Sequence, residues 1–333
     1  MAPLRVGLIG AGGIAGAHAR GYRQLAEEGL VRVTAVCDPV AEHARRRAQE
    51  LSALHTCAAY GDLLALEVDA VDICLPHDLH AEVALAAFAA GKHVLVEKPV
   101  ATTLEDAKRM VAAARSASVV FQVGHNERFD PQYQEMKRLL DKDAIGEVVV
   151  ARADHNQNVR LPDGHWLYST ARSGGGALIG SGIHRVDLLH WFLGEVAEVY
   201  SVQRTLAGRF EGEAAALTTL RFRSGAMATL STNWAVRRSP WYELMWLYGT
   251  HGSMHNVGGL HLDSERQREC DGGFVHVPLQ QADSFTEEIR HFLECVDMGR
   301  QPLTSGEEGL CALAVCLASY RSAKLEQPVV VEM

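Results

Sequence analysis

The 333-residue sequence predicts an α/β protein with two domains. Two observations lead to this fold class: apolar runs alternate with helical patterns through the first third of the chain, and longer segments of alternating polarity occupy much of the remainder. A chain of this length that is 47% hydrophobic can bury a core in each of two domains. We therefore expect a doubly wound parallel sheet in residues 1–122 and a second α/β domain in residues 123–333.

Strand and helix patterns follow one another regularly at the start of the chain. Five short apolar runs carry few polar positions, which is typical of parallel strands that helices cover on both faces. These runs are residues 4–10, 31–38, 70–76, 93–99 and 119–125. The helical patterns are residues 14–28, 40–52, 79–90, 103–116 and 131–140.

The remainder of the chain has a different texture. Four long segments alternate between apolar and polar residues and are separated by turn residues, as antiparallel strands are. They are residues 147–156, 215–225, 226–236 and 241–249. Amphipathic helices are predicted near 284–298 and 306–322, and residues 328–332 resemble a closing strand. The second domain is thus expected to contain a large, mostly antiparallel open sheet.

A glycine-rich turn joins the first predicted strand to the first predicted helix. Its residues Gly10, Gly12, Gly13, Ile14 and Ala15 fit the pattern G-x-G-x-x-G/A. Gly10 permits the tight turn, Gly12 lets the backbone approach a pyrophosphate, and Ala15 lets the helix pack near the strand. The helix N-terminus offers free N–H groups and a partial positive charge to phosphates. The turn therefore predicts a dinucleotide-binding site.

Asp38 ends the second predicted strand, where a carboxylate can accept hydrogen bonds from both ribose hydroxyls of a dinucleotide. The same carboxylate would repel a 2′-phosphate, so the sequence favours NAD over NADP as the cofactor. The alternative is that Asp38 only begins the next helix as its N-cap, with Pro39 at the first helical position.

Glu97, Lys98 and Pro99 stand at the carboxyl end of the predicted strand 93–99, where ligands bind in open α/β sheets. The ammonium of Lys98 can hydrogen-bond a substrate oxygen there and stabilise alkoxide character during hydride transfer. The alternative is that Lys98 is a surface lysine paired with Glu97.

A glycine run precedes a predicted helix at residues 181–192. His184 and Asp187 are three residues apart and therefore lie on one face of this helix. A histidine can take the proton of a hydroxyl as its hydride leaves, and a carboxylate can fix the tautomer of that histidine. The alternative is a core histidine whose polar atoms bond to a helix neighbour.

Composition and charge exclude several classes of protein. A net charge of −9 argues against a nucleic-acid partner, and the basic cluster Arg45–Arg47 is expected to be a solvated helix face. The seven cysteines include no CxxC pair, and no His and carboxylate set has ligand spacing, so we expect neither disulfides nor a metal site. With no basic leader and no apolar run of membrane length, we expect a cytoplasmic protein without a membrane partner.

Four segments together resemble the glucose-fructose oxidoreductase, inositol dehydrogenase and rhizopine-catabolism (Gfo/Idh/MocA) family over essentially the whole chain. They are VGLIGAGGIAGAHARGY, DICLPHDLHAEVALAAFAAGKHVLVEKPVATTLEDA, GHNERFDPQY and GGGALIGSGIHRVDLLHWFLG. The spaced combination is far more specific than any one segment. The resemblance implies a Rossmann domain followed by an α/β domain whose large open sheet joins subunits into homodimers or homotetramers.

The resemblance also implies roles for individual residues. Lys98 and His184 match the lysine and histidine of the family's active site. The residues expected to line the cofactor are Leu75, Pro76, His77, His80, Glu97 and Lys98. Asn126 is expected near the nicotinamide and the substrate.

The polar segment 154–166 and the residues that follow it carry side chains that can bind hydroxyls and stack on a sugar face. The predicted substrate-binding residues are therefore His155, Trp166 and Arg172, together with Asn126 and the two catalytic candidates Lys98 and His184.

One position departs from the family's pattern. The family commonly has an aspartate four residues before the histidine, but here that residue is Gly180. Either Asp187, Asp154 or the substrate itself supplies the missing acid, or the pocket is larger and admits a bulkier substrate such as a glycoside.

The sequence as a whole predicts an NAD-dependent oxidoreductase that moves a hydride to or from a hydroxyl-bearing carbon of a sugar, a glycoside or a cyclic polyol such as an inositol. One alternative is a glycoside hydrolase or lyase that uses bound NAD transiently, without net redox change. A second alternative, from a different class, is a sensor that holds NAD without catalysis.

Overall fold

The computed structural model describes residues 3–206, 208 and 210–333, and the chain divides into two compact units. The first unit runs to Phe129 and also contains Ala282–Leu310, whereas the second contains Asp130–Gln281 and Cys311–Met333. These units differ from the expected division at residue 122, because a late segment of the chain returns to the first unit. Ile289 and Phe292 of that segment are fully buried in the core of the first unit.

The first unit contains a six-stranded sheet in the order β3-β2-β1-β4-β5-β6, in which all neighbours are parallel. Its strands are β1 (Leu4–Ile9), β2 (Val31–Cys37), β3 (His55–Cys57), β4 (Ala70–Ile73), β5 (His93–Glu97) and β6 (Phe121–Gly124). Its helices are α1 (Ala15–Glu27), α2 (Ala41–Leu51), α3 (Tyr60–Leu64), α4 (His80–Ala89), α5 (Leu104–Ala117) and α9 (Ser284–Met298). The predicted doubly wound parallel sheet is confirmed.

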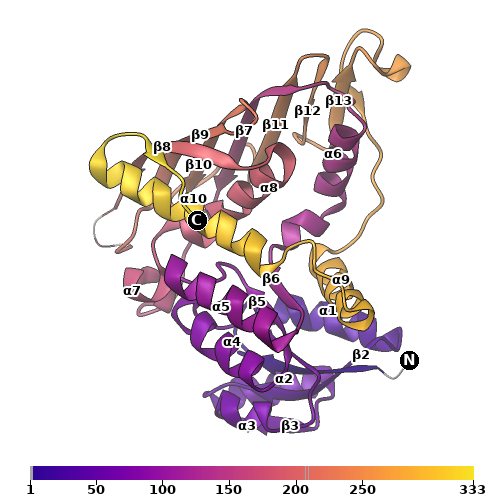
Figure 1. Ribbon diagram of the computed structural model, residues 1–333, viewed down its shortest axis with the longest axis vertical. Helices are drawn as coiled ribbons and strands as arrows, with labels where there is room; N and C mark the ends of the chain where they lie inside the picture. The colour runs from indigo at the N-terminus through magenta and orange to yellow at the C-terminus, as the bar shows by residue number, and fades with distance from the viewer. Residues whose placement is uncertain (1–2, 207, 209) are drawn as a thin grey trace. The chain divides into compact units, whose positions relative to one another are not determined.

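Figure 1 shows α9 beside α1, although the two helices are far apart in the sequence. A Cβ atom at Gly21 of α1 would lie 2.9 Å from Ile289 of α9, so the glycine lets the two helices approach closely. The apolar strands explain the core: Leu8, Ile73 and Val96 are almost completely buried because helices cover the sheet. The carboxyl ends of all six strands meet at one edge of this sheet.

The second unit contains a nine-stranded sheet in the order β14-β13-β12-β11-β7-β10-β9-β8-β15. Its strands are β7 (Val148–Asn156), β8 (Val196–Arg204), β9 (Ala215–Phe222), β10 (Met227–Asn233), β11 (Glu243–Gly249), β12 (Gly252–His255), β13 (His261–Ser264), β14 (Val275–His276) and β15 (Val329–Val330). Its helices are α6 (Pro131–Asp141), α7 (Thr170–Ser173), α8 (Ile183–Leu193) and most of α10 (Gly306–Leu325). Among the described strands of this sheet only β7 and β10 pair in parallel, so the predicted mostly antiparallel sheet is confirmed.

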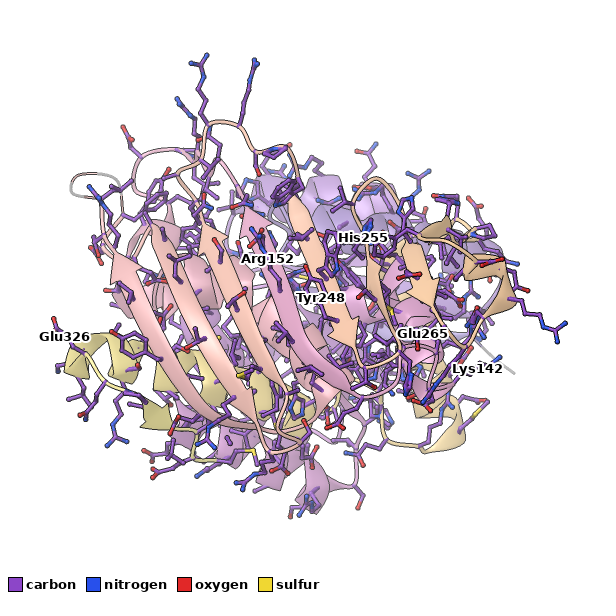
Figure 2. The ribbon with its side chains drawn as sticks, turned by 90° about the horizontal axis from the view of Figure 1, so that it is seen from above. Lys142, Arg152, Tyr248, His255, Glu265 and Glu326 are labelled. Carbon is purple, nitrogen blue, oxygen red and sulfur yellow. The ribbon has the colours of Figure 1, made fainter. Side chains whose placement is uncertain are left out.

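The two faces of the second sheet differ. Along β9, Leu220 and Phe222 are buried whereas Leu217 and Arg221 are not, which is the period of two expected for a half-covered strand. Helix α8 packs on the covered face against β7 and β10. The other face carries Arg152 and Tyr248 on neighbouring strands, as Figure 2 shows.

The closing strand predicted at 328–332 is β15, but the sequence did not predict β3 or β12 to β14, because strands of two to four residues are too short to show a period. It also missed β8, although this strand has nine residues. Within the described residues, no helix is both long and apolar enough to cross a membrane.

Candidate active site

The glycine-rich turn lies between β1 and α1, as predicted. Gly10 has a φ of +93°, and a Cβ atom there would overlap the carbonyl oxygen of Cys74, so only glycine fits. Ala15 is fully buried and begins α1. A Cβ atom at Gly12 or Gly13 would have no neighbour within 4 Å, so this side of the turn is open. The open turn at a helix N-terminus fits the pyrophosphate of a dinucleotide.

Asp38 follows β2 and connects the glycine-rich turn to α2. One carboxylate oxygen accepts a hydrogen bond from the N–H of Ala11 (2.9 Å), and the other accepts one from the N–H of Val40 (2.8 Å). Helix α2 begins at Ala41 with Val40 as its N-cap, so the interpretation of Asp38 as the N-cap and Pro39 as the first helical residue is wrong. Each oxygen keeps a lone pair for a further donor.

Arg47 of α2 also reaches the glycine-rich turn, although the sequence did not single it out. It is buried, its guanidinium lies 3.4 Å from the carbonyl oxygen of Gly12, and it forms an ion pair with Glu50. Arg45 and Arg46 are exposed, so the predicted solvated face is correct for two of the three arginines.

Leu75, Pro76, His77 and His80 lie after β4 and at the start of α4, and His80 is fully buried. Its ring nitrogens lie 2.7 Å from the carbonyl oxygen of Pro99 and 2.9 Å from that of Leu75. Burial lowers the pKa of His80, although both hydrogen bonds favour the charged form. His80 therefore holds the turn after β4 against the turn after β5.

Strand β5 ends at Glu97, and Lys98 and Pro99 follow at the same edge of the sheet, joined by a cis peptide bond. Glu97 is buried, and its Oε2 accepts a hydrogen bond from the backbone N–H of Lys98 (3.2 Å). Burial lowers the pKa of the Lys98 ammonium, whereas the charges of Glu97 and Glu127 raise it. Lys98 is partly buried rather than fully exposed, and the charge of Glu97 acts on its ammonium, as the alternative of a lysine paired with Glu97 also expects.

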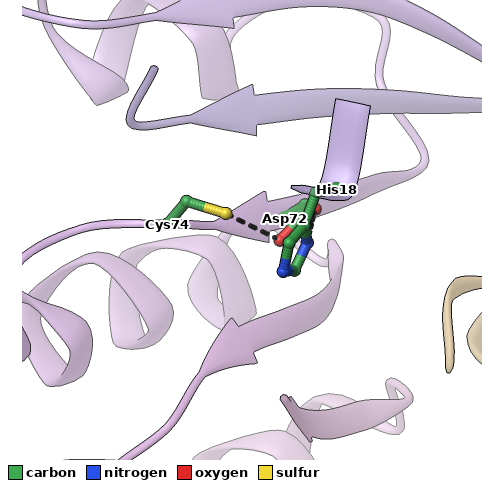
Figure 3. Close-up of side chains that lie close together, drawn as sticks. All are labelled: His18, Asp72 and Cys74. Carbon is green, nitrogen blue, oxygen red and sulfur yellow. Dashed lines mark hydrogen bonds and ion pairs between the residues drawn. The ribbon is translucent and has the colours of Figure 1, made fainter. Parts of the chain in front are cut away.

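His18 on α1 belongs to this region, and the sequence did not predict it. Its ring is fully buried, with Nδ1 2.7 Å from Asp72 Oδ2 and Nε2 2.9 Å from Glu97 Oε1. Figure 3 shows the ring beside Asp72, whose other oxygen lies 3.6 Å from the sulfur of Cys74. The signal that could have revealed His18 is a histidine at a core-facing position of α1, in line with Ala15 and Tyr22.

Asn126 follows β6, also at the carboxyl end of a strand of the first sheet. Its side-chain amide donates a hydrogen bond to the hydroxyl of Ser284 at the start of α9 (2.9 Å). The first unit therefore collects the glycine-rich turn, Asp38, Lys98 and Asn126 at one edge of its sheet.

In the second unit, His184 and Asp187 are both buried on α8. The predicted helix at 181–192 is α8 together with the end of a π-helical segment, Leu178–Gly182, that precedes it. π-Helical turns are rare, and the sequence pattern did not predict this one.

Glu213 fixes the start of that π-helical segment. Its carboxylate accepts hydrogen bonds from the N–H groups of Gly176 (2.9 Å) and Leu178 (2.7 Å), and from the hydroxyl of Tyr320 (3.1 Å). Burial raises the pKa of Glu213, although these hydrogen bonds favour the ionised form. The sequence did not single out this carboxylate.

His155 on β7 lies near His184, with ring centroids 6.5 Å apart and ring planes 21° from parallel. The ring of Tyr242 lies 5.2 Å from that of His155. The substrate-binding candidate of β7 and the catalytic candidate of α8 therefore lie together on the covered face of the second sheet.

Asp154, one residue earlier, points to the opposite face of the sheet. There it accepts hydrogen bonds from the indole of Trp241 (3.0 Å) and from Arg152 (3.1 Å). Because successive side chains of a strand point to opposite faces, Asp154 does not supply an acid beside His184.

Gly180 does not enlarge the pocket, because a Cβ atom there would overlap the indole of Trp234. Trp234 is 1% exposed, and its Nε1 donates a hydrogen bond to Ser181 Oγ (2.7 Å). The Ser181 hydroxyl donates to Gln157 Oε1 (2.8 Å), and the Gln157 amide donates to the hydroxyl of Tyr242. The interpretation that Gly180 admits a bulkier substrate is therefore wrong, since a buried indole fills the space.

Trp166 and Arg172 line a surface cavity of about 560 Å³ in the second unit. Aromatic and charged side chains share its wall; among them are His165, Tyr168, Phe210 and Glu211. Burial and the charge of Arg172 lower the pKa of His165. The substrate-binding candidates of this unit thus occupy two places, this cavity and the covered face beside His184.

Two regions of the chain match models of protein families. Residues 4–125 match a model described as "Oxidoreductase family, NAD-binding Rossmann fold", and residues 133–255 match one described as "GFO/IDH/MocA C-terminal domain". The two matches together cover most of the chain.

Individual proteins are similar over most or all of their length. 1,5-Anhydro-D-fructose reductase of Ensifer adhaerens is 32% identical over 280 residues, which cover 80% of each chain. Myo-inositol 2-dehydrogenase of Thermotoga maritima is 28% identical over 344 residues and 99% of each chain. A solved structure of levoglucosan dehydrogenase with NADH and L-sorbose is 25% identical, with a TM-score of 0.91 over 100% of both chains.

Proposed function

Because the chain belongs to the GFO/IDH/MocA family of oxidoreductases, we propose that it transfers a hydride between NAD and a hydroxyl-bearing carbon of a sugar, glycoside or cyclic polyol such as an inositol. The observation that carries the proposal is Lys98, a partly buried ammonium beside the carboxylate of Glu97 at the carboxyl edge of a dinucleotide-binding sheet.

In this proposal the cofactor lies along the carboxyl edge of the first sheet. Its pyrophosphate binds at the turn formed by Gly10, Gly12, Gly13, Ile14 and Ala15. The adenosine ribose bonds to Asp38, whose charge favours NAD over NADP. Leu75, Pro76, His77, His80, Glu97 and Lys98 line the rest of the site.

A bound nicotinamide would accept or supply the hydride, and side chains of the protein would handle the proton. His184 accepts the proton of the substrate hydroxyl during oxidation and returns it during reduction. Lys98 hydrogen-bonds the same oxygen and stabilises its negative charge. Asp187, one helical turn from His184, orients the imidazole. With Asp154 on the other face of its sheet, Asp187 and the substrate remain the candidates for the acid absent at Gly180.

Asn126, His155, Trp166 and Arg172 are the proposed substrate-binding residues besides Lys98 and His184. Polar atoms of Asn126, His155 and Arg172 can bond to sugar hydroxyls, and Trp166 offers a flat apolar surface for a sugar ring. The solved relative that carries L-sorbose and NADH is consistent with a small sugar as the ligand.

We also propose a homodimer or homotetramer formed through the uncovered face of the second sheet. This face carries large apolar side chains at exposed positions of the strands β8, β9 and β11: Tyr200, Val202, Leu217 and Tyr248. A patch of this kind is typical of a protein–protein interface.

The test is the variant Lys98→Met, assayed by NADH absorbance with inositols and with hexoses supplied free and as glycosides. We expect turnover to fall by at least about 100-fold, since the oxygen would lose its charged hydrogen-bond donor, with NADH affinity changed less than about threefold. Lys92→Met is the matched control, because Lys92 lies at the amino end of β5 and bonds to the carbonyl of Val68.

Retention of more than a few per cent of turnover by Lys98→Met would contradict the proposal. The same assay with NADP tests the role given to Asp38. A comparison of NADH released with substrate lost separates net oxidation from a redox-neutral hydrolase or lyase, and no turnover with any of these substrates despite tight NAD binding would favour a sensor.

A further inference from the structure

His18 is bound on both sides by carboxylates inside the core of the first unit. Nδ1 lies 2.7 Å from Asp72 on β4, and Nε2 lies 2.9 Å from Glu97 on β5, with no part of the His18 ring exposed. A neutral imidazole donates through only one nitrogen, whereas an imidazolium donates through both. Two ionised acceptors on opposite sides of one ring therefore match the charged form.

The electrostatic surroundings favour the same form. Burial lowers the pKa of His18, whereas the charge and the hydrogen bond of Asp72 raise it, and the net result is a pKa well above the ordinary value. Burial raises the pKa of Glu97, but the hydrogen bond and charge of His18 and the charge of Lys98 lower it by more. The net result is a lowered pKa. An imidazolium between two carboxylates is thus the consistent assignment.

Three further titratable groups lie in this region: Cys74, Tyr22 and Glu288. Burial and Asp72 raise the pKa of Cys74 to about 12, so the thiol keeps its proton. Burial and Asp72 also raise the pKa of Tyr22 on α1, and Glu288 of α9 acts in the same direction. The side of α9 nearest the ring carries Phe285, whose ring centroid lies 5.5 Å from that of His18.

His18, Asp72 and Cys74 also have ligand atoms within 4.8 Å of one another, which is compatible with a metal ion. The 2.7 Å between Nδ1 and Asp72 is a charge-assisted hydrogen-bond distance. Two ligands of a tetrahedral zinc site, each about 2.0 Å from the ion, lie about 3.3 Å apart. The geometry therefore favours a proton over a metal ion between these atoms.

Glu97 connects this buried pair to Lys98. One carboxylate oxygen accepts from His18, and the other accepts from the backbone N–H of Lys98 (3.2 Å). A Cβ atom at Gly124 on β6 would lie 3.1 Å from the Glu97 carboxylate, so β6 closes the remaining side. The carboxylate that favours the protonated form of Lys98 is thus held in place and kept ionised by His18.

We infer that His18 is a positioning residue for the reaction: its imidazolium holds Glu97 ionised and oriented, and Glu97 in turn sets the position and the charge of Lys98. The inference rests on the proposed function, in which Lys98 acts as a charged donor to the substrate oxygen. His18 lies on α1, the helix that begins at the glycine-rich turn. In this proposal the N-terminus of α1 binds the cofactor, and the His18 side chain of the same helix positions Lys98 through Glu97.

The test compares pH profiles of kcat for the full-length wild type and His18→Gln. The glutamine amide can still donate to Glu97 but carries no charge, so Glu97 should take up a proton more readily and Lys98 should lose its counter-charge. We expect the alkaline limb of kcat, where Lys98 loses its proton, to move to lower pH by about one unit. At any pH above the wild-type limb kcat should therefore fall about tenfold, with NADH affinity changed less than about threefold.

His93→Gln is the matched control, because His93 lies at the amino end of the same strand and accepts a hydrogen bond from the N–H of Val120. Its alkaline limb should coincide with that of the wild type. If His18→Gln does not fold, the protonation state of His18 can be measured in the wild type from ¹⁵N spectra of its histidines, with Asp72→Asn used to assign the His18 signals. We expect a His18 ring that is protonated on both nitrogens at pH 7.5. A neutral ring, an unshifted limb in His18→Gln, or a stoichiometric metal ion in the purified protein would overturn the inference.

Failure of this inference and failure of the proposed function can be told apart. If Lys98→Met loses turnover but His18→Gln keeps the wild-type limb, only the role of His18 is wrong. If Lys98→Met keeps its turnover, the proposed role of the lysine is wrong as well.

Discussion

The two units hold their candidate catalytic residues with opposite kinds of polar cluster. The buried cluster next to Lys98 is ionic, because the imidazole of His18 lies between the carboxylates of Asp72 and Glu97. On the covered face near His184, the hydrogen-bonded chain through Trp234, Ser181, Gln157 and Tyr242 contains no group that is charged at neutral pH.

The two clusters fix their groups in different ways. A buried ionic cluster is costly unless every charge is paired, so it fixes a protonation state strongly. A neutral chain fixes positions without fixing a charge. The environment of Lys98 therefore fixes a charge, whereas the space beside Gly180 is filled by the neutral indole of Trp234.

The variant Gly180→Asp gives the largest expected effect on stability and tests the neutral side of the comparison. The new side chain would overlap the indole of Trp234 and place a carboxylate in the neutral cluster. We expect a loss of about 3 kcal/mol in the free energy of unfolding, measured by urea denaturation.

Gly61→Asp is the matched control for this variant, because a Cβ atom at Gly61 would have no neighbour within 4 Å. In the double variant Gly180→Asp/Trp234→Ala, removal of the indole relieves the overlap, so the combined loss should be smaller than the sum of the single losses. If the urea midpoint of Gly180→Asp alone equalled that of the wild type, the space beside Gly180 would not be filled by the indole.

Ser181→Ala gives a smaller expected effect. The hydroxyl accepts from Trp234 and donates to Gln157, so its removal leaves a buried indole N–H without its acceptor. We expect a loss of about 2 kcal/mol in the free energy of unfolding, again from urea denaturation. The control Ser224→Ala, which removes one hydrogen bond to the carbonyl of Leu193, should cost less than about 0.5 kcal/mol. Equal losses for Ser181→Ala and Ser224→Ala would argue against the hydrogen-bonded series from Trp234 to Tyr242.

The smallest expected effect is the pH dependence of stability that the ionic cluster causes. The pKa of His18 is raised in the folded protein, so its stabilising contribution is complete below the ordinary pKa of 6.5 and is lost as the pH rises through the folded value. The difference in melting temperature between the wild type and His18→Gln should therefore shrink as the pH is raised from 6.5 towards 10. A constant difference would mean that His18 is neutral throughout.

Most of the fold could be predicted because its signals are local. The alternation of buried strands with helices gave five of the six strands of the first sheet, and the period of two gave β7, β9, β10 and β11 of the second. The return of α9 to the first unit could not be predicted, since the contact of Ile289 with Gly21 joins residues that are distant along the chain.

The candidate site divides in the same way. Gly10, Asp38, Lys98 and His184 could be singled out because each stands at a recognisable place in a motif or at the end of a predicted element. The core-facing position of His18 on α1 could have been noticed in the same way, but its two partners could not, because the sequence gives no sign that strands β4 and β5 each bring a carboxylate to its ring.

The sequence by itself determined the class of the protein, its dinucleotide-binding turn and the types of its candidate catalytic groups, because periodicity and motif spacing are properties of neighbouring residues. Only the tertiary structure decided that the space beside Gly180 holds an indole, that Asp154 faces away from His184, and that His18 lies between two carboxylates. Each of these depends on contacts between segments that are far apart in the chain, and local patterns do not encode them.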